Sequence, residues 1–492
     1  MVYRPTIGLE IHAQLKTQTK LFCRSINNPF EKEPNLHVCP ICLGHPGTLP
    51  VLNEEALIKT AVAGEALNCK ITSRTFFERK NYFYPDIPKG YQISQYQSPL
   101  CENGYLDIKT ETGIKKIRIT RIHLEEDTGK LLHSEDGQYS LVDFNRAGVP
   151  LMELVTEPDL TSGVEVQAFA EELRLTLRYL GVSDADMEKG QMRVEVNISI
   201  SKDENLGTKV EIKNLNSIRA AAQSVDFEIA RQAKLLEAEE SVVQETRGWN
   251  ENKRETFSQR VKEGSADYRY FPEPDLPPLN LGEDFIKKVK ARIGELPRQR
   301  RDRFAKEYRL GGEAIEVLVQ NKKLGDFFEQ VCSEMIAWDK IEHAHRPEEE
   351  HYPELFKIAS NFLINDLQAL LGSEETTYSD LKITPHHLGE FVVRVFHKEI
   401  SSSNATTLLG TMFETGQEPS QIIEEQDLGQ VSDLAEIEKA VVAVIAENEV
   451  AVRDFKAGKE ASLQFLVGQV MAKTKGKADP GLARDIIKKS LK

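Results

Sequence analysis

A run of prolines near residue 272 limits how this chain can fold, because it separates two regions of different character. Four prolines lie within the seven residues from Pro272 to Pro278. Proline fixes its own φ and has no backbone N–H, so neither a continuous helix nor a central strand can pass through this run. The sequence before it mixes strand-like and helix-like patterns, and the sequence after it is almost entirely helix-like.

The proline run and a second, polar break at residues 401–404 predict three domains. A chain of 492 residues has room for about three domains of ordinary size. We predict an α+β fold class, with an N-terminal domain at residues 1–293 that is built on an antiparallel sheet. An all-α helical domain at residues 294–403 and a helical tail domain at residues 404–492 are expected to follow.

The tail ends in a basic stretch that has two interpretations. Residues 471–492 carry seven basic and two acidic side chains, whereas the whole chain has a net charge of −15. The stretch is either a solvated helix face or a contact surface for a phosphate backbone. Upstream of the tail, His343, His345 and His351 lie among glutamates, and we expect these histidines at the surface.

Charge and composition exclude several classes of protein. The negative net charge argues against a surface that coats nucleic acid or anionic membrane throughout, although it is compatible with a local basic patch. No window reaches the ~20 apolar residues of a membrane helix, and the N-terminus lacks a signal or transit pattern. Six cysteines are too few for a disulfide framework. We therefore expect a cytoplasmic globular protein with no membrane partner.

Several predicted strands present carboxylates and cations on one face. In the first strand Ile7, Leu9 and Ile11 alternate with Glu10 and His12, and successive side chains of a strand point to opposite faces. The same alternation recurs in three further segments, at residues 117–125, 193–200 and 209–213. Such a face suits Mg²⁺ and a phosphoryl group, because hard oxygen ligands hold the metal and cations offset the phosphate charge. An ordinary solvated face explains the pattern as well.

The segment at residues 79–96 is unusual because polar-tipped aromatic side chains lie beside basic ones. It contains four tyrosines, one phenylalanine and three basic residues, while two prolines and a glycine prevent a regular helix. Tyrosine rings stack on bases or riboses, and lysines contact phosphates. A packed turn region is the alternative. The segment at residues 143–150 is similar in character, with Asn145 and Arg146 at a glycine turn.

Together, these segments resemble those of one family, the B subunits of aspartyl/glutamyl-tRNA amidotransferases. The resemblance extends over essentially the whole chain. The segments that carry it are residues 8–12, 39–44, 79–95, 123–127, 143–148, 211–217, 244–247 and 267–275. No G-x-x-x-x-G-K-[ST] motif occurs, which excludes a Walker-type loop as the nucleotide site.

The resemblance implies both a fold and a function. In this family the N-terminal domain is a cradle that resembles the glutamine synthetase fold, and the tail contacts tRNA. The cradle uses ATP and Mg²⁺ to phosphorylate the side-chain carboxylate of Glu-tRNA(Gln), or of Asp-tRNA(Asn), and ammonia then displaces the phosphate. The amidase of the heterotrimer, its A subunit, hydrolyses glutamine to supply the ammonia, and the small C subunit completes the assembly. The expected enzyme is a glutamine-hydrolysing carbon–nitrogen ligase, and the sequence does not say which of the two tRNAs it uses.

The resemblance also assigns site residues. The expected Mg²⁺ ligands are Glu10, His12, Glu125 and Glu153. The residues that match the lining of the ammonia tunnel and the active site are Lys80, Tyr82 and Lys89, with Lys89 as a polar gate beside the acceptor. The candidates for contact with phosphate or with the aminoacyl end are Asn145 and Arg146. These residue types suit the reaction, because carboxylates hold the metal and cations spread the charge of a transferring phosphoryl group.

Three cysteines resemble part of a zinc site. They are Cys23, Cys39 and Cys42, and the last two form a C-x-x-C pair. Many family members that keep this knuckle have a second upstream cysteine, but here Ser25 stands at that position. Either His37 or His45 completes a structural Zn²⁺ site, or the three cysteines are a remnant that binds no metal.

Two other functions are compatible with the sequence. The first is a tRNA-binding scaffold whose cradle has lost its activity, and the intact Glu10, Glu125 and Lys89 argue against it. The second is a free-standing ATP-dependent ligase for a small amino acid, and the basic tail argues against that. The Gly-Gly-Ser-Ser-Gly signature of the amidase is absent from this sequence, so we expect the amidase partner to be required for the use of glutamine.

Overall fold

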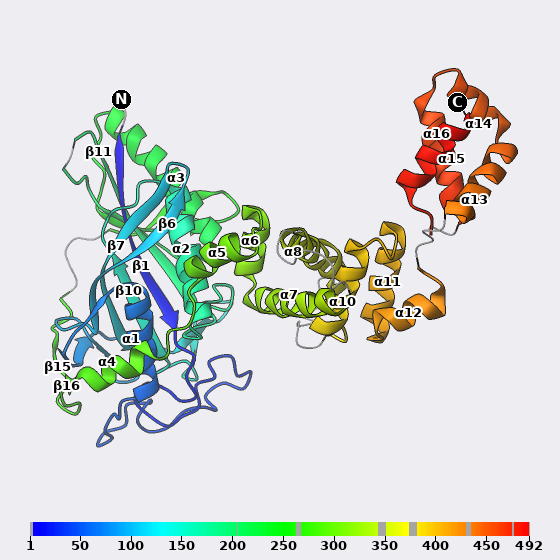
Figure 1. The fold of residues 1–492 in the computed structure, drawn as a ribbon. Coiled ribbons are helices and arrows are strands. Elements are labelled where there is room, and N and C mark those ends of the chain that lie inside the picture. Colours follow the sequence, from blue (N-terminus) through cyan, green and yellow to red (C-terminus); the bar gives the residue numbers. More distant parts are fainter. Residues whose placement is uncertain are drawn as a thin grey trace. The chain divides into compact units, whose positions relative to one another are not determined.

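A computed structural model describes residues 3–203, 205–261, 267–342, 351–372, 381–429, 434–474 and 477–491. The chain divides into two compact units, Met1–Pro297 and Arg298–Lys492. The first unit contains the strands and the second is helical (Figure 1), which confirms the α+β class. The division into three domains, with a separate tail from residue 404, stays a prediction.

Among the described residues, nine strands form the main sheet of the first unit, in the order β14-β13-β12-β11-β1-β10-β7-β6-β2. Their bounds are β1 Arg4–Gln14, β2 Lys70–Ile71, β6 Cys101–Thr110, β7 Gly113–Glu126, β10 Pro150–Thr156, β11 Met192–Ser201, β12 Val210–Lys213, β13 Glu245–Asn250 and β14 Glu255–Val261. Neighbours are antiparallel, as predicted, except β12 and β13, which are parallel. Helix α3 (Ile218–Glu237) connects these two strands, and a helical crossover returns the chain in the same direction.

The main sheet has one apolar and one polar face. Ile7, Leu9 and Ile11 of β1 are fully buried in the core of the first unit. The same core contains Phe169 of α2 (Gly163–Tyr179) and Val225 of α3, so these helices cover the apolar face. The charged side chains that alternate with the apolar ones therefore lie together on the opposite face.

Three helices of the first unit begin at residues whose side chains cap them, and a glycine allows two of these helices to pack closely. Asn53 caps α1 (Glu54–Ala66), Ser162 caps α2 and Ser217 caps α3, each with a side-chain oxygen that accepts from backbone N–H groups of the first turn. Gly163 lets α2 pack closely on α3, because a Cβ there would lie 2.4 Å from the carbonyl oxygen of Ala222. A fourth helix, α4 (Glu283–Lys290), packs against α1.

The proline run is part of the first unit and is not a free linker. β15 (Phe271–Pro272) pairs with β4 (Glu78–Asn81), which pairs with β5 (Tyr91–Ser94). Arg79 donates two hydrogen bonds to the carboxylate of Glu273, at 2.7 and 2.8 Å. A short edge strand tolerates proline, because its N–H need not be paired. Two more pairs complete the unit: β3 (Arg74–Thr75) with β16 (Leu279–Asn280), and β8 (Lys130–His133) with β9 (Ser140–Asp143).

The second unit consists of helices in its described part. They are α5 Pro297–Glu307, α6 Gly312–Gln320, α7 Lys322–Glu342, α8 Tyr352–Asn361, a π-helical segment Phe362–Leu367, α9 Gln368–Leu371, α10 Pro385–Phe396, α11 Ser402–Thr415, α12 Pro419–Gln426, α13 Leu434–Glu447, α14 Glu449–Lys456, α15 Glu460–Lys473 and α16 Pro480–Leu491. Ile437, Leu466 and Ile487 belong to a core shared by the helices from α13 to α16.

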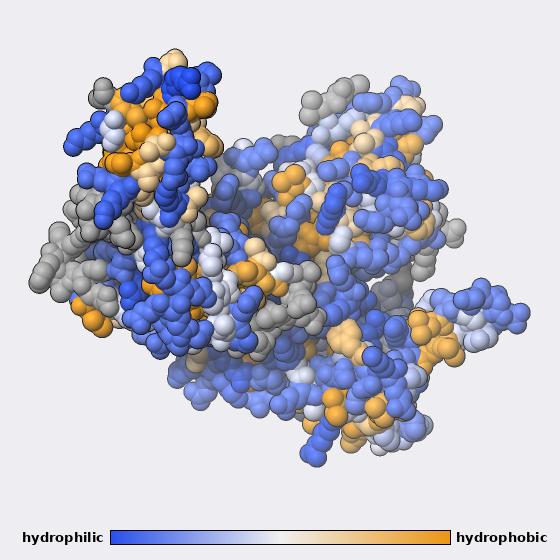
Figure 2. Space-filling view, turned by 90° about the vertical axis from the view of Figure 1, so that its right-hand side faces the viewer, coloured by the Kyte–Doolittle hydropathy of each residue, from blue (hydrophilic) through white to orange (hydrophobic). Residues whose placement is uncertain are grey.

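The surface agrees with the highly charged composition. The face drawn in Figure 2 is mostly hydrophilic, with apolar residues in separate patches, as is normal for folded proteins. Within the ranges that the structure describes, no helix is both long enough and apolar enough to cross a membrane.

One buried carboxylate connects three helical segments of the second unit. Asp339 of α7 accepts hydrogen bonds from His351, just before α8, at 2.7 Å and from His397, just after α10, at 2.8 Å. The expectation of a surface position is therefore wrong for His351, because its ring is held by a buried partner. The other two histidines of that segment, His343 and His345, lie outside the described residues. Burial would raise the pKa of Asp339, but the hydrogen bonds and charges of the two histidines lower it.

Replacement of this carboxylate should destabilise the second unit in a pH-dependent way. We expect Asp339→Asn to lower the free energy of unfolding at pH 7 by about 1.5–3 kcal/mol, because hydrogen bonds to a charged group are lost. A depressed carboxyl pKa stabilises the fold above the unfolded value of ~3.9, and this contribution is lost as the pH falls through the folded value. The difference from wild type should therefore begin to shrink below about pH 4 and disappear once the pH falls below the depressed pKa of Asp339.

Urea unfolding followed by the fluorescence of the neighbouring Trp338 measures this difference. Asp485→Asn, which changes an exposed carboxylate of α16, is the matched control and should unfold like wild type. An Asp339→Asn protein as stable as the control at pH 7 would contradict the prediction, and so would a loss that persists unchanged at pH 3.

Candidate active site and cysteine cluster

Strand register brings charged side chains of four neighbouring strands together on the polar face of the main sheet. His12 of β1 lies opposite Glu153 of β10 on one side and opposite Arg193 of β11 on the other. Glu153 in turn lies opposite His123 of β7. Directly opposed residues of antiparallel strands have Cβ atoms about 5 Å apart, so these side chains interact.

Five side chains of these strands form a group that we call the carboxylate–histidine cluster. Its members are Glu10, His12, His123, Glu125 and Glu153. Nε2 of His12 lies 3.4 Å from Glu153 Oε2, 3.7 Å from Glu125 Oε1 and 3.9 Å from Glu10 Oε1. Nε2 of His123 lies 3.5 Å from Glu153 and 3.7 Å from Glu125. All four residues predicted to hold Mg²⁺ are thus side by side, and His123 joins them.

The donor set of the cluster fits a divalent cation. Two triplets, Glu10–His12–Glu153 and His123–Glu125–Glu153, each offer ligand atoms within 4.8 Å of one another. Carboxylate oxygens are the ligands that Mg²⁺ prefers. Nδ1 of both histidines is buried and has no hydrogen-bond partner among the described residues, so their ring orientation is set by the carboxylates at Nε2. A cation at the first triplet would be held by Glu10, His12 and Glu153, and a cation at the second by Glu125, Glu153 and His123.

The charges within the cluster stabilise one another. Burial would raise the pKa values of Glu125 and Glu153, but His123, His12 and Lys80 lower both. Burial would lower the pKa of His12, but its hydrogen bond with Glu153 and the charge of that carboxylate raise it to about 8. Glu10 differs, because burial and the nearby Glu153 raise its pKa. At neutral pH the centre of the cluster therefore carries two buried carboxylates whose charge needs compensation.

Lys80 supplies part of that compensation from the aromatic segment. Burial would lower its pKa, but the charges of Glu125, Tyr270 and Glu153 raise it, so Lys80 stays a cation at neutral pH. Its Nζ lies 5.1 Å from the ring centroid of Tyr268 and 5.8 Å from that of Tyr82. The structure thus brings the predicted Lys80 and Tyr82 to the cluster, and it adds the tyrosines of residues 267–275.

Lys89 lies beside the cluster in a pocket of its own. Its Nζ is 2.5 and 2.6 Å from the two carboxylate oxygens of Glu126, and Glu126 also accepts from the backbone N–H of Ile93 at 2.9 Å. Cys42, Asp127 and Gly148 line the same pocket as this pair. Lys89 is therefore an anchored ion-pair partner of Glu126, the residue after Glu125 in β7.

Asn145 and Arg146 are not brought into the cluster. The side-chain amide of Asn145 is fully buried, accepts from the backbone N–H of His37 at 2.8 Å and donates to the carbonyl of Glu33 at 2.8 Å. Arg146 donates to the carbonyl oxygens of Thr128 and Gly129, at 3.0 and 2.9 Å. Both residues hold loops in place, and their contact with phosphate or tRNA stays a prediction.

A neighbouring group of charges was not predicted from the sequence. Glu195 of β11 lies opposite Glu10, and together with Glu211 of β12 it offers oxygens within 4.8 Å of that residue. Lys213 Nζ lies 2.8 Å from Glu195 and 3.6 Å from Glu211. Burial would lower the pKa of Lys213, but both carboxylates raise it. Alternation along residues 193–200 and 209–213 gave the signal for this group, but only the register shows that the two strands share it.

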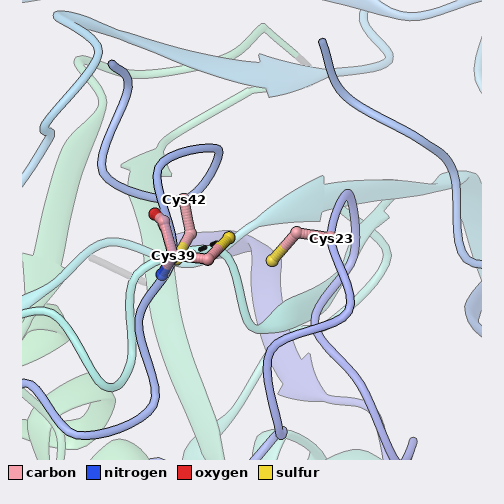
Figure 3. A group of neighbouring side chains, drawn as sticks. All are labelled: Cys23, Cys39 and Cys42. Atoms are coloured by element: carbon pink, nitrogen blue, oxygen red, sulfur yellow. Dashed lines mark hydrogen bonds between the residues drawn. The ribbon is translucent and has the colours of Figure 1, made fainter. Parts of the chain in front are cut away.

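The three cysteines lie together near the polar face, in loops that follow β1 (Figure 3). The sulfur atoms of Cys39 and Cys42 are 3.8 Å apart, and Cys42 also accepts from the backbone N–H of Cys39 at 3.1 Å. Lys20, which is fully buried, places its Nζ 3.8 Å from Cys42 Sγ, and the Ser25 hydroxyl lies 3.9 Å from that sulfur. Hydrogen bonding from Cys23 and the charge of Lys20 lower the pKa of Cys42 against burial.

Three thiol ligands fit Zn²⁺, and the fourth position differs from the expectation. The three sulfur atoms lie within 4.8 Å of one another, as in a tetrahedral site. Neither His37 nor His45 belongs to this group, so the expectation of a histidine as the fourth ligand is wrong for the described residues. Three thiolates on one Zn²⁺ would leave an excess negative charge, which the ammonium of Lys20 beside Cys42 would offset.

The first unit is thus a sheet that carries a carboxylate–histidine cluster with flanking cations, and a helical unit follows it. Comparison with family models agrees with this division. Residues 5–287 match the GatB/GatE catalytic domain, and residues 350–491 match the GatB domain.

Relatives of similar length extend the comparison to the whole chain. The chain is 46% identical over 494 residues to a protein of Persephonella marina, with 100% of each chain covered. It is 45% identical over 496 residues to one of Caldicellulosiruptor saccharolyticus, with 100% of this chain and 99% of that protein covered. Both relatives are named as the B subunit of an aspartyl/glutamyl-tRNA(Asn/Gln) amidotransferase. The chain belongs to the GatB family.

The cluster should bind a divalent cation through its carboxylates. We expect the double replacement Glu10→Gln with Glu125→Gln to weaken Mn²⁺ binding, measured by electron paramagnetic resonance with Mn²⁺ in place of Mg²⁺, at least about tenfold. The control is Glu111→Gln with Glu135→Gln, which removes two exposed carboxylates of the same unit. Equal Mn²⁺ affinity of the two double variants would contradict the assignment.

The cysteine cluster should retain zinc with help from Lys20. We expect tag-free protein to contain about one zinc per chain by mass spectrometry of the metal. Lys20→Met should lose zinc to a chelator roughly tenfold more readily, because a neighbour that donates to a ligand strengthens metal binding. Lys32→Met, at an exposed lysine of the same region, should behave like wild type. Zinc-free wild-type protein, or a zinc content unchanged by Cys42→Ser, would show that the thiols are a remnant.

Proposed function

We propose that this chain is the B subunit of a tRNA-dependent amidotransferase and carries its ATP-dependent transamidation site. The substrate is a misacylated tRNA, Glu-tRNA(Gln) or Asp-tRNA(Asn), and the product is Gln-tRNA(Gln) or Asn-tRNA(Asn). The observation that carries this proposal is the carboxylate–histidine cluster with Lys80 at its edge. The names of the full-length relatives support the choice of substrate.

The reaction needs two steps, because a carboxylate is a poor electrophile. First, a side-chain carboxylate oxygen of the aminoacyl group attacks the γ-phosphorus of ATP, and the bond to the β–γ bridging oxygen breaks with its electron pair going to ADP. Second, ammonia attacks the acyl carbon, the C–O bond to phosphate breaks, and the nitrogen loses a proton. Mg²⁺ held by the predicted ligands Glu10, His12, Glu125 and Glu153 would offset the negative charge that spreads over the γ-phosphoryl oxygens.

The lysines act as fixed cations in this scheme. Since the carboxylates raise its pKa, Lys80 is unsuited to accept a proton at neutral pH, and it stabilises negative charge at the edge of the cluster. Lys89 is held by both oxygens of Glu126, in the pocket that Asp127 and Gly148 also line. We assign it to the polar gate through which ammonia reaches the acceptor.

The proposal includes two protein partners. The chain lacks the serine- and glycine-rich signature of an amidase, so a separate amidase, the A subunit, supplies ammonia from glutamine, and the small C subunit completes the complex. The helical second unit, with its basic end, supports contact with tRNA. The likeness of the first unit to the glutamine synthetase fold remains part of this proposal.

Transamidation by the complex in the absence of glutamine hydrolysis tests the proposed function. The assay uses the heterotrimer with the amidase nucleophile removed, and supplies ATP, Mg²⁺, ammonium chloride and Glu-tRNA(Gln). We expect conversion to Gln-tRNA(Gln) by wild type, and a rate lowered about 100-fold or more by Glu125→Gln, because a metal-bearing carboxylate is lost. The control Glu111→Gln should keep the wild-type rate.

The outcomes separate the proposed function from its rivals. No conversion by wild type despite tRNA binding would favour a scaffold without catalytic activity. Use of free glutamate in place of the tRNA would favour a small-substrate ligase. Full activity of Glu125→Gln would move the site away from the cluster.

A further inference from the structure

Arg193 is a cation of the polar face that has no role in the two-step scheme. It lies on β11, opposite His12 in the register, and therefore points to the same face as the cluster. Its Nη2 donates to Asp127 Oδ1 at 3.2 Å. Within the described ranges no other protein acceptor is hydrogen-bonded to this guanidinium, and 42% of the side chain is exposed. The remaining N–H groups are thus available to a ligand.

Asp127 is a rigid anchor for this guanidinium. The carboxylate is buried, and it accepts from Gln14 Nε2 and from the backbone N–H of Thr128, each at 2.9 Å. Arg146 lies 3.6 Å from its second oxygen. The groups that hold the anchor in place, Gln14 and the backbone of Thr128, are not members of the cluster.

The other cations near the cluster are paired in a different way. Lys213 lies 2.8 Å from Glu195, Arg121 lies 3.7 Å from Glu153, and Lys80 faces Glu125 and Glu153. Arg121 and Lys80 thus face carboxylates of the cluster itself, and Lys213 faces the neighbouring Glu195. The counter-ion of Arg193 lies outside the cluster, although Glu195 and Glu125 are close enough to raise its pKa further after Asp127. Arg193 therefore keeps its charge and its free N–H groups when the carboxylates hold a metal.

We propose that Arg193 is a catalytic residue that contacts the γ-phosphoryl oxygens of the nucleotide, and that Asp127 is its positioning residue. This inference rests on the proposed function. A guanidinium is planar, permanently charged and matched to phosphate oxygens by its paired N–H groups. As the acceptor carboxylate bonds to the γ-phosphorus and ADP departs with the electron pair of the broken P–O bond, Arg193 stabilises the charge on the oxygens between them. It neither gives nor takes a proton.

Comparison of two nucleotides tests this contact. Binding of Mg²⁺ with ADP and with the β,γ-imido analogue of ATP is measured by calorimetry on the complete heterotrimer. For Arg193→Gln we expect affinity for the analogue to fall about tenfold, as a charge-assisted hydrogen bond is lost, with ADP affinity within about twofold of wild type. Arg193→Lys should recover part of the loss, because a point charge replaces a planar fork. Arg219→Gln, at an exposed arginine of α3, is the control.

The anchor is tested by the same ratio of affinities. Asp127→Asn keeps the shape of the side chain but removes its charge, and we expect it to lower the ratio of analogue to ADP affinity in the same direction as Arg193→Gln. If Asp127 had only a structural role, its replacement would lower the affinities for both nucleotides together and leave their ratio unchanged. The amidation rate of Arg193→Gln with ammonium chloride should fall about 100-fold or more.

Failure of this inference is distinguishable from failure of the proposed function. If wild type binds neither nucleotide, the proposed function itself is wrong. If wild type binds both and Arg193→Gln keeps the wild-type ratio, Arg193 does not contact the γ-phosphoryl group. If Arg193→Gln loses affinity for both nucleotides in equal proportion and its unfolding midpoint falls, Arg193 stabilises the fold and has no specific contact with the γ-phosphoryl group.

Discussion

The charge of two buried carboxylates, Glu125 and Glu153, has to be compensated if the polar face of the main sheet is to be stable. Isolated carboxylates in a buried site would take up protons, because burial disfavours the charged form. Here two histidines and Lys80 keep both pKa values low. A site that holds charge in this way is prepared for a metal ion, since the ligands are ionised before the ion arrives.

That compensation depends on strand register. The pairing of β1 with β10 and β11 places His12 between Glu153 and Arg193. A slip of one residue would turn His12 toward the core and Ile11 toward the cluster, because side chains alternate between the faces. The buried side chains of β1 and the helices packed on them therefore fix the site as much as they fix the fold.

Alternation along single strands predicted a sheet with one charged face, and the family resemblance added the grouping of Glu10, His12, Glu125 and Glu153. Alternation did not single out His123, Glu195 or Arg193. Their place in the site depends on which strands are neighbours, and the sequence of one strand does not show which distant strand it pairs with. The parallel pair β12 and β13 was missed for the same reason. Likewise, His351 binds a carboxylate on another helix, and no local pattern of charges indicates that contact.

The pairing of β15 with β4 has a consequence for the time at which the site can form during synthesis. Arg79 and its partner Glu273 are 194 residues apart in the chain. Chains grow at roughly 5–20 residues per second, so β4, which carries Lys80, can pair with β5 at once but waits about 10–40 s for its second neighbour, β15. During that interval the aromatic segment lacks its contacts with β15 and Glu273. A chaperone or a protein partner that binds early would therefore bind the segment before these contacts form.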